Sequence, residues 1–195
     1  MQQPSIQSAQ VLTPAARLQQ LLPELFTSTP VAGEQFLRLQ LTSELTIAIA
    51  LSWVEETFLA SPQWVTPMPN MAPHVLGLMS SKSRVFWAVD LVQLLGLSIA
   101  PKLSQNYEVV LIRTLPLEMV QPNKQDIANP DNELFLGLVV PKIKGSVRLT
   151  LEDIVSPIAE VDANLQPYLS GQVVLGGETI LVLSAEAIGI SQMSL

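Results

Sequence analysis

The sequence predicts an all-β fold built from two similar barrels, and three observations support this prediction. Ten apolar segments have the length of a strand, and the clearest of them alternate apolar with polar residues, the period of a half-buried strand. Clusters of Pro, Gly, Asn and Ser separate these segments. A weak internal repeat also relates residues 73–90 to residues 167–184. Two similar barrels explain such a repeat better than one large sheet.

The first 32 residues form an extension that differs from the rest of the chain. After a polar start, Thr13 and Pro14 are suited to the N-cap and first position of a helix, and Pro23 ends or bends that helix near Leu22. Its apolar residues follow helical spacing: Leu18, Leu21, Leu22, Leu25 and Phe26. This periodicity leaves two alternatives open, a helix packed on its own domain and a helix that docks into a partner's groove.

The strands begin after Gly33, so residues 33–195 are predicted to form the domain. "FLRLQL" (36–41) and "LTIAIA" (45–50) are joined by a tight link and predict a hairpin. The segment 115–133 carries three prolines and neither period, which is typical of a surface loop. The remaining predicted strands are 54–60, 76–81, 84–89, 107–113, 134–140, 143–149, 171–175 and 178–183.

The repeat aligns "PHVLGLMSSKSRVFWAVD" (73–90) with "PYLSGQVVLGGETILVLS" (167–184), which places Gly77 over Gly171. Gly176-Gly177 is a two-residue loop of the kind that tight hairpins prefer, because both residues adopt positive φ without steric cost. By analogy, Lys82-Ser83 is predicted to be the tip of a second hairpin.

Each repeat is predicted to end in a short helix. Asp90 and Ser184 are suited to N-cap positions directly after the second strand of their hairpins. Gly96 and Gly189 follow within two turns and are predicted to close the two helices.

Composition limits the classes of function. With 48% hydrophobic residues, a chain of 195 residues buries a sizeable core, and its net charge of -7 repels phosphate backbones, so no nucleic-acid partner is expected. The absence of cysteine excludes disulfides and thiolate metal sites and favours a reducing cytosol. No secretory signal and no bilayer-spanning run is evident, so we expect a cytoplasmic protein without direct membrane insertion.

No catalytic constellation is evident in the sequence. His74 is the only histidine and lacks the neighbouring ligands that a metal requires, and the nucleophile-elbow and phosphate-loop motifs are missing. The carboxylates, Glu55 and Glu56 among them, are scattered over loops and strand rims. We therefore expect no catalytic residues, no metal and no cofactor, and regard a small barrel enzyme as the least favoured class.

The strand "VFWAVD" is apolar on both faces, with Val85, Trp87 and Val89 on one face and Phe86 and Ala88 on the other. The core of one barrel covers one face, and either the second barrel or a partner protein must cover the other. Trp87 therefore lies either in the seam between the barrels or at an interface. The same two alternatives apply to Trp53 and Trp64.

The segment "HVLGLMSSKSRVFWAVDLVQLLGL" (74–97) resembles the signature of the CheW-like coupling proteins of bacterial chemotaxis. That signature has an apolar Gly-Leu strand, an Asn-x-Arg-Gly turn, a strand that ends in Val-Asp-Leu, and a short helix. Other segments are similar to further parts of the family: "LTIAIALSWVEETF", "FLGLVVPKIKGSVRL" and "YLSGQVVLGGETILVLSAEAI". The resemblance covers about residues 33–190 and implies two small five-stranded barrels with an apolar groove between them.

The resemblance also implies a non-catalytic adaptor. The family joins the cytoplasmic tip of a chemoreceptor to the regulatory domain of a CheA-type histidine kinase, at membrane-associated receptor arrays. Val54 and Glu56 match family positions that help to contact partners, Lys82 replaces the arginine of the turn, and Trp87 replaces a common proline. With Arg84 at the same rim, these residues form the predicted partner interface.

Two departures from the family leave alternatives open. Lys82 keeps the charge of the usual arginine but loses its planar fork, and Pro141 replaces an aspartate. Three alternatives remain for the chain: an adaptor of a receptor array, an adaptor of pilus-based taxis, or a regulatory module that has lost receptor coupling. Since Gly176-Gly177 makes the matching turn without charge, Lys82 and Arg84 serve either solubility or a partner.

Overall fold

The computed structural model describes residues 33–97, 106–114, 134–155 and 161–192. The predicted N-terminal helix and the predicted loop 115–133 lie outside these residues. No helix in the described ranges has the length and apolar character needed to cross a membrane.

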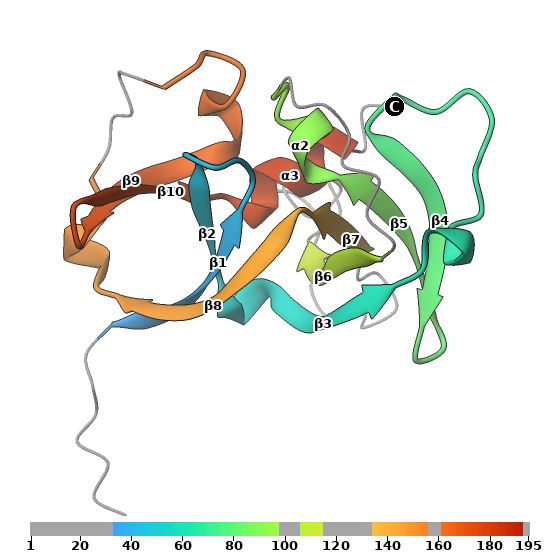
Figure 1. The fold of residues 1–195 in the computed structure, drawn as a ribbon, viewed down its shortest axis with the longest axis horizontal. Helices are drawn as coiled ribbons and strands as arrows, with labels where there is room; N and C mark the ends of the chain where they lie inside the picture. Colours follow the sequence, from blue (N-terminus) through green and yellow to red (C-terminus); the bar gives the residue numbers. More distant parts are fainter. Residues whose placement is uncertain (1–32, 98–105, 115–133, 156–160, 193–195) are drawn as a thin grey trace, which may run out of the picture. The chain divides into compact units, whose positions relative to one another are not determined.

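The described residues form two five-stranded sheets, which confirms the all-β fold class (Figure 1). Sheet 1 has the strand order β8-β1-β2-β10-β9, and sheet 2 has the order β3-β6-β7-β5-β4. All ten predicted strands are confirmed, with shifts of one or two residues at their ends. The strands are β1 (Glu34–Gln40), β2 (Thr46–Ala50), β3 (Val54–Ala60), β4 (Val75–Ser81), β5 (Arg84–Asp90), β6 (Tyr107–Thr114), β7 (Leu134–Val140), β8 (Lys142–Leu149), β9 (Leu169–Leu175) and β10 (Glu178–Leu183).

Each sheet combines strands from both halves of the chain. The β1–β2 hairpin pairs with β8 and β10, whereas β6 and β7 pair with β3 and β5. The chain leaves sheet 1 through the 3₁₀ turn η1 (Leu51–Trp53) and returns to it at Pro141, between β7 and β8. The two sheets therefore have the same topology, in which β3, β6, β7, β5 and β4 correspond to β8, β1, β2, β10 and β9.

The backbone pairing confirms the internal repeat. Gly77 lies opposite Ala88 and Gly171 lies opposite Val182, and each glycine follows a one-residue irregularity in its strand. Both predicted hairpin tips are also confirmed. Lys82 and Ser83 have φ values of 45° and 67°, and Gly176 and Gly177 have φ values of 60° and 85°.

Both predicted N-caps are confirmed, but only one of the predicted helix ends is. Asp90 accepts hydrogen bonds from the backbone N–H groups of Val92 and Gln93, at 3.0 and 3.1 Å, and caps α2 (Leu91–Leu94). The Ser184 hydroxyl accepts from the N–H of Ala187 at 3.2 Å at the start of α3 (Ala185–Gln192). Gly96 closes α2 with a φ of 68°.

The prediction that Gly189 closes the second helix is wrong. Helix α3 continues past Gly189 to Gln192. A Cβ atom at this position would lie 2.9 Å from the Cβ of Thr114 on β6. The glycine therefore allows the helix to approach the strand closely and does not end it.

Three hydrophobic clusters form the core. Each sheet surrounds one smaller cluster, and the shared cluster, with the most residues, joins both sheets to α2 and α3. Buried side chains of the shared cluster include Leu39, Ile47 and Ile49 of sheet 1 and Ile112, Leu136 and Leu138 of sheet 2. Because the shared cluster covers the second face of each sheet, the central strands are apolar on both faces.

Candidate partner-binding site

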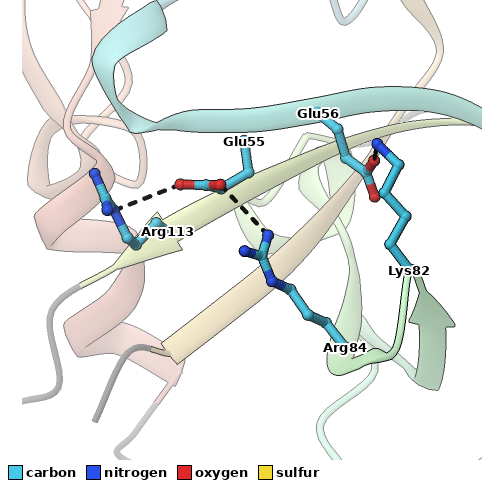
Figure 2. Close-up of polar contacts among 5 residues, drawn as sticks. All are labelled: Glu55, Glu56, Lys82, Arg84 and Arg113. Atoms are coloured by element: carbon cyan, nitrogen blue, oxygen red, sulfur yellow. Dashed lines mark hydrogen bonds and ion pairs between the residues drawn. The ribbon is translucent and has the colours of Figure 1, made fainter. Parts of the chain in front are cut away.

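Ion pairs connect the hairpin tip of β4–β5 to the edge strand β3 of sheet 2 (Figure 2). The Lys82 ammonium contacts the Glu56 carboxylate, and Arg84 Nη1 lies 3.4 Å from Glu55 Oε2. Strands β3 and β4 are the opposite edges of this sheet, so the sheet curls far enough for its edges to approach each other. We call Glu55, Glu56, Lys82, Arg84 and Arg113 the charged rim.

A β-bulge directs both glutamates to the rim. Val54 pairs with Ile112 and Glu56 pairs with Leu111, which leaves Glu55 without a partner in the ladder. In a regular strand, adjacent side chains point to opposite faces, but the extra residue of a bulge is redirected. Glu55 and Glu56 can therefore both meet cations of the rim, as Figure 2 shows.

Glu55 lies between two guanidinium groups. Arg113 Nε on β6 is 3.6 Å from Glu55 Oε1, on the other side of the carboxylate from Arg84. The Arg84 guanidinium also lies over the ring of Phe135, 4.6 Å from its centroid, a cation–π contact. Arg84 is thus held by a carboxylate and an aromatic ring, although 47% of its side chain remains exposed.

The backbone at the hairpin tip is strained. Non-glycine residues with positive φ place Cβ close to a carbonyl oxygen, at a cost of roughly 1–2 kcal/mol per residue. Lys82 and Ser83 adopt this conformation, whereas glycines occupy the equivalent tip of β9–β10. Glycine would make the same turn with less strain. The presence of Lys82 is therefore better explained by a role of its side chain than by the backbone geometry of the turn.

The structure brings together three of the five predicted interface residues, namely Glu56, Lys82 and Arg84. The other two, Val54 and Trp87, are half-buried and pack against the shared cluster. Sequence reasoning did not name Glu55, Arg113 or Phe135 as residues of this site. It also favoured solubility or a partner over a role in folding for the two cations, whereas both form ion pairs within the chain.

The face of β5 that carries Val85, Trp87 and Val89 is covered along part of its length. Val89 is fully buried in the shared cluster, and Trp87 packs against its margin, in the seam between the sheets. Val85, nearer the hairpin tip, is 68% exposed. Of the other two tryptophans, Trp53 also packs on the shared cluster, whereas Trp64 is largely exposed.

His74 is half-buried, and its carbonyl oxygen accepts a hydrogen bond from the Asp90 N–H at 2.8 Å. Within the described ranges, no group of three or more His, Asp or Glu side chains is arranged to hold a metal ion.

The ionisation of Glu56 is linked to stability. The hydrogen bond from Lys82, with a smaller contribution from Ser81, lowers the pKa of Glu56 below its ordinary value. A lowered folded-state pKa stabilises the fold above the ordinary glutamate pKa of about 4.3, and this stabilisation is lost as the pH falls through the folded-state pKa. We expect Glu56→Gln to be less stable than wild type at neutral pH. This difference in stability should shrink as the pH falls below the ordinary glutamate pKa and through the folded-state pKa.

Urea unfolding of both proteins at a series of pH values measures this difference. The matched background is Lys82→Ser, in which the effect of Glu56→Gln should lose most of its pH dependence. A difference that stays constant from neutral to acid pH in the wild-type background would contradict the linkage.

Comparison with known proteins identifies a family and a similar fold. Residues 35–192 match the family described as CheW-like domain. Among solved structures, the scaffolding protein TtCheW from Thermoanaerobacter tengcongensis superimposes with a TM-score of 0.61 at 14% identity, over 79% of this chain and 90% of that chain. At this identity the likeness supports the fold alone. The curated proteins give no match.

Proposed function

The chain belongs to the CheW-like domain family, and from this membership we propose that it is a non-catalytic adaptor in a chemotaxis-like signalling system. It couples the cytoplasmic tip of a chemoreceptor to the regulatory domain of a CheA-type histidine kinase, in the cytoplasm at a receptor array. Its work is protein–protein contact, so it requires neither a cofactor nor a metal.

The observation that carries this proposal is the charged rim at a strained hairpin tip. Strained backbone persists where the surrounding structure supports it, and it is common at functional sites. Lys82 accepts the strain of a positive φ, and its ammonium is fixed by Glu56, whose side chain is only 14% exposed. A charge fixed at an interface rim orients the partner and raises the association rate more than it raises affinity.

The proposed interface combines this rim with neighbouring apolar residues. Val54 precedes the bulge of β3, and Trp87 lies on β5 between the buried Val89 and the exposed Val85. Fixed charges beside partly exposed apolar side chains are typical of a protein–protein interface, in which an apolar centre has a polar margin.

A second candidate is a regulatory module that binds the kinase without a receptor. Lys82 favours this candidate, because an ammonium cannot replace a bidentate arginine at a contact that needs a planar fork. A role in pilus-based taxis is compatible with either candidate, since the adaptor chemistry is the same.

The first experiment is capture of the full chain from its native cell with identification of the bound proteins by mass spectrometry. Recovery of a histidine kinase together with a methyl-accepting receptor supports the adaptor, and recovery of the kinase alone supports the regulatory module. Recovery of neither protein, with purified kinase regulatory domain and receptor tip also failing to bind, would refute both candidates.

The second experiment separates the side chain of Lys82 from its backbone conformation. The variant Lys82→Gly/Ser83→Gly copies the tip of the β9–β10 hairpin. Its melting temperature should stay close to that of wild type, because relief of the positive-φ strain offsets the loss of the ion pair between Lys82 and Glu56. We expect it to bind the kinase regulatory domain at least about 1 kcal/mol more weakly, with a loss that shrinks as salt rises. Lys142→Ser, which removes an exposed cation on β8, is the matched control and should leave binding unchanged.

A further inference from the structure

The two sheets differ in charge at one position of their central strands. Strand β1 lies between β2 and β8 in sheet 1 and corresponds to β6 in sheet 2 (Figure 1). On β1, Arg38 lies opposite Ala48 of β2 and Gly145 of β8. On β6, the equivalent residue is Leu111, opposite Gly137 of β7, and it is fully buried in the small cluster of sheet 2. An arginine therefore stands in sheet 1 where the same fold accommodates a leucine.

The side chain of Arg38 points towards the small cluster that sheet 1 surrounds. Residues two apart on a strand share a face of the sheet. Phe36, two residues earlier, and Ala48, directly opposite, both belong to this small cluster, whereas Leu37 and Leu39 belong to the shared cluster. Arg38 is half-buried, so it lies at the margin of the small cluster and reaches the surface.

The guanidinium of Arg38 has no partner within the chain. Its Nε–H group is buried and donates no hydrogen bond. Among the residues that the structure describes, no carboxylate lies within ion-pair distance of this side chain. Nε is the one guanidinium nitrogen that is both buried and unpartnered, so Nη1 and Nη2 are open to solvent. A buried donor without an acceptor lowers stability, and leucine at this position would avoid that cost.

A carboxylate on the same face of sheet 1 is held by other groups. Glu178 accepts a hydrogen bond from the Thr46 hydroxyl at 2.6 Å, and Lys144 Nζ lies 4.0 Å from its Oε1. Thr46 lies opposite Gln40, two residues beyond Arg38 on β1. Glu178 is therefore bound at this end of the sheet without a contact to Arg38.

The space beside Arg38 is open on the β8 side. A Cβ atom at Gly145 would meet no atom of the described residues within 4 Å. In sheet 2 the equivalent residue opposite Leu111 is Glu56, whose side chain pairs with Lys82. Sheet 1 thus has a cation without an anion next to a position that carries no side chain.

We propose that Arg38 binds a carboxylate group from outside the chain. The N–H groups of Nη1 and Nη2 form a fork that matches the two oxygens of a carboxylate. Because the guanidinium is partly buried, water and salt screen this contact less than they screen a contact at a fully exposed arginine. The carboxylate belongs either to a free small acid or to an acidic side chain of a protein, and the titration below separates these two sources. The site lies on sheet 1, away from the charged rim, and does not depend on the adaptor function.

The variant Arg38→Leu copies Leu111 of sheet 2 and tests the cost of the arginine. Its melting temperature should rise by about 2–4 °C, because leucine leaves no buried donor without an acceptor. Lys142→Ser removes an exposed cation from the neighbouring strand β8 and should leave the melting temperature unchanged. A melting temperature of Arg38→Leu below that of wild type would show that the arginine serves the fold and would overturn the proposal.

NMR titrations of the full chain at constant ionic strength test the site itself. The probes are glutarate, a free small acid, and a hexaglutamate peptide. The Nε–H signal of Arg38, assigned by its absence in Arg38→Lys, and the backbone amide of Gly145 report on binding. Shifts with glutarate indicate a site for small acids, and shifts with the peptide alone indicate a site for acidic side chains of a protein. No shifts with either probe, or equal shifts with sodium chloride, would overturn the proposal.

Three variants separate the fork of Arg38 from a general effect of charge. At equal net charge, Arg38→Lys should bind the probe about threefold more weakly or worse, because a bidentate contact becomes a single one. Lys142→Ser should bind as wild type does. Equal binding by wild type and Arg38→Lys would overturn the proposal. Binding that appears only in Glu178→Gln would also overturn it, because Arg38 would then be paired with Glu178 in solution.

Discussion

Replacement of Gly77 by alanine is expected to destabilise the protein by about 3 kcal/mol or more, because it combines backbone strain with a steric clash. Gly77 has a φ of 142°, and a Cβ atom there would lie 2.2 Å from the carbonyl oxygen of Thr66. Thr66 and Leu78 are joined by two backbone hydrogen bonds of 2.8 and 2.9 Å, so the oxygen cannot move without loss of this bridge. Urea unfolding of wild type and variant measures the effect.

The equivalent glycine of sheet 1 is the matched comparison. A Cβ atom at Gly171 would lie 2.5 Å from Cγ2 of Ile154 and 3.2 Å from the oxygen of Val155. Because a side chain can rotate away and a backbone bridge cannot, Gly171→Ala should cost less than Gly77→Ala. Ser80→Ala, at an exposed position of β4, should have almost no effect. Equal losses at Gly77 and Ser80 would contradict the predicted clash.

Glu56→Lys is expected to have the largest effect on partner binding. The substitution removes a carboxylate whose side chain is 14% exposed and places a second cation beside Lys82. Like charges at this distance repel, so the lysine at the hairpin tip loses its fixed position. We expect affinity for the kinase regulatory domain or receptor tip to fall more than tenfold, which corresponds to about 1.4 kcal/mol or more. Isothermal titration at low salt measures this loss.

The charge-swapped variant Glu56→Lys/Lys82→Glu separates a structural role of the pair from a role in binding. The swap restores an ion pair between β3 and the hairpin tip, so the melting temperature should return towards that of wild type. Binding should remain weak, because the partner then meets charges of the opposite sign at the rim. If the swap restored both stability and affinity, the pair would serve the fold alone.

The sequence predicts the strands well because their signals are local. Alternation along β1, the glycine pair between β9 and β10, and the N-caps at Asp90 and Ser184 each depend on neighbouring residues. These signals also identify the repeat and hence the equivalence of the two hairpin tips. Local signals cannot predict that the β1–β2 hairpin joins the sheet formed by β8, β9 and β10. This arrangement depends on pairings between segments that are distant in the sequence.

The same limit explains the errors at individual residues. Gly189 stands where a helix stop is common, and only the approach of Thr114 on β6 shows that it serves close packing. Glu55 resembles a solvated strand residue, because a bulge leaves no clear mark in the sequence. Arg113 meets Glu55 because β6 pairs with β3 beside this bulge, and Arg84 reaches Glu55 only because sheet 2 curls. The sequence therefore predicted Glu56, Lys82 and Arg84 but not the residues that hold Arg84 in place.

The exchange of strands between the two halves also determines the order in which the chain can fold during synthesis. Sheet 2 consists of β3 to β7, so all its strands are available once β7 has left the ribosome. The β1–β2 hairpin is made first, but its partners β8 and β10 are made last. At about 5–20 residues per second, the hairpin waits for seconds with both of its ladder edges open. An unpaired, apolar hairpin is a template for aggregation, so β1 and β2 are exposed to aggregation during synthesis for longer than the strands of sheet 2 are.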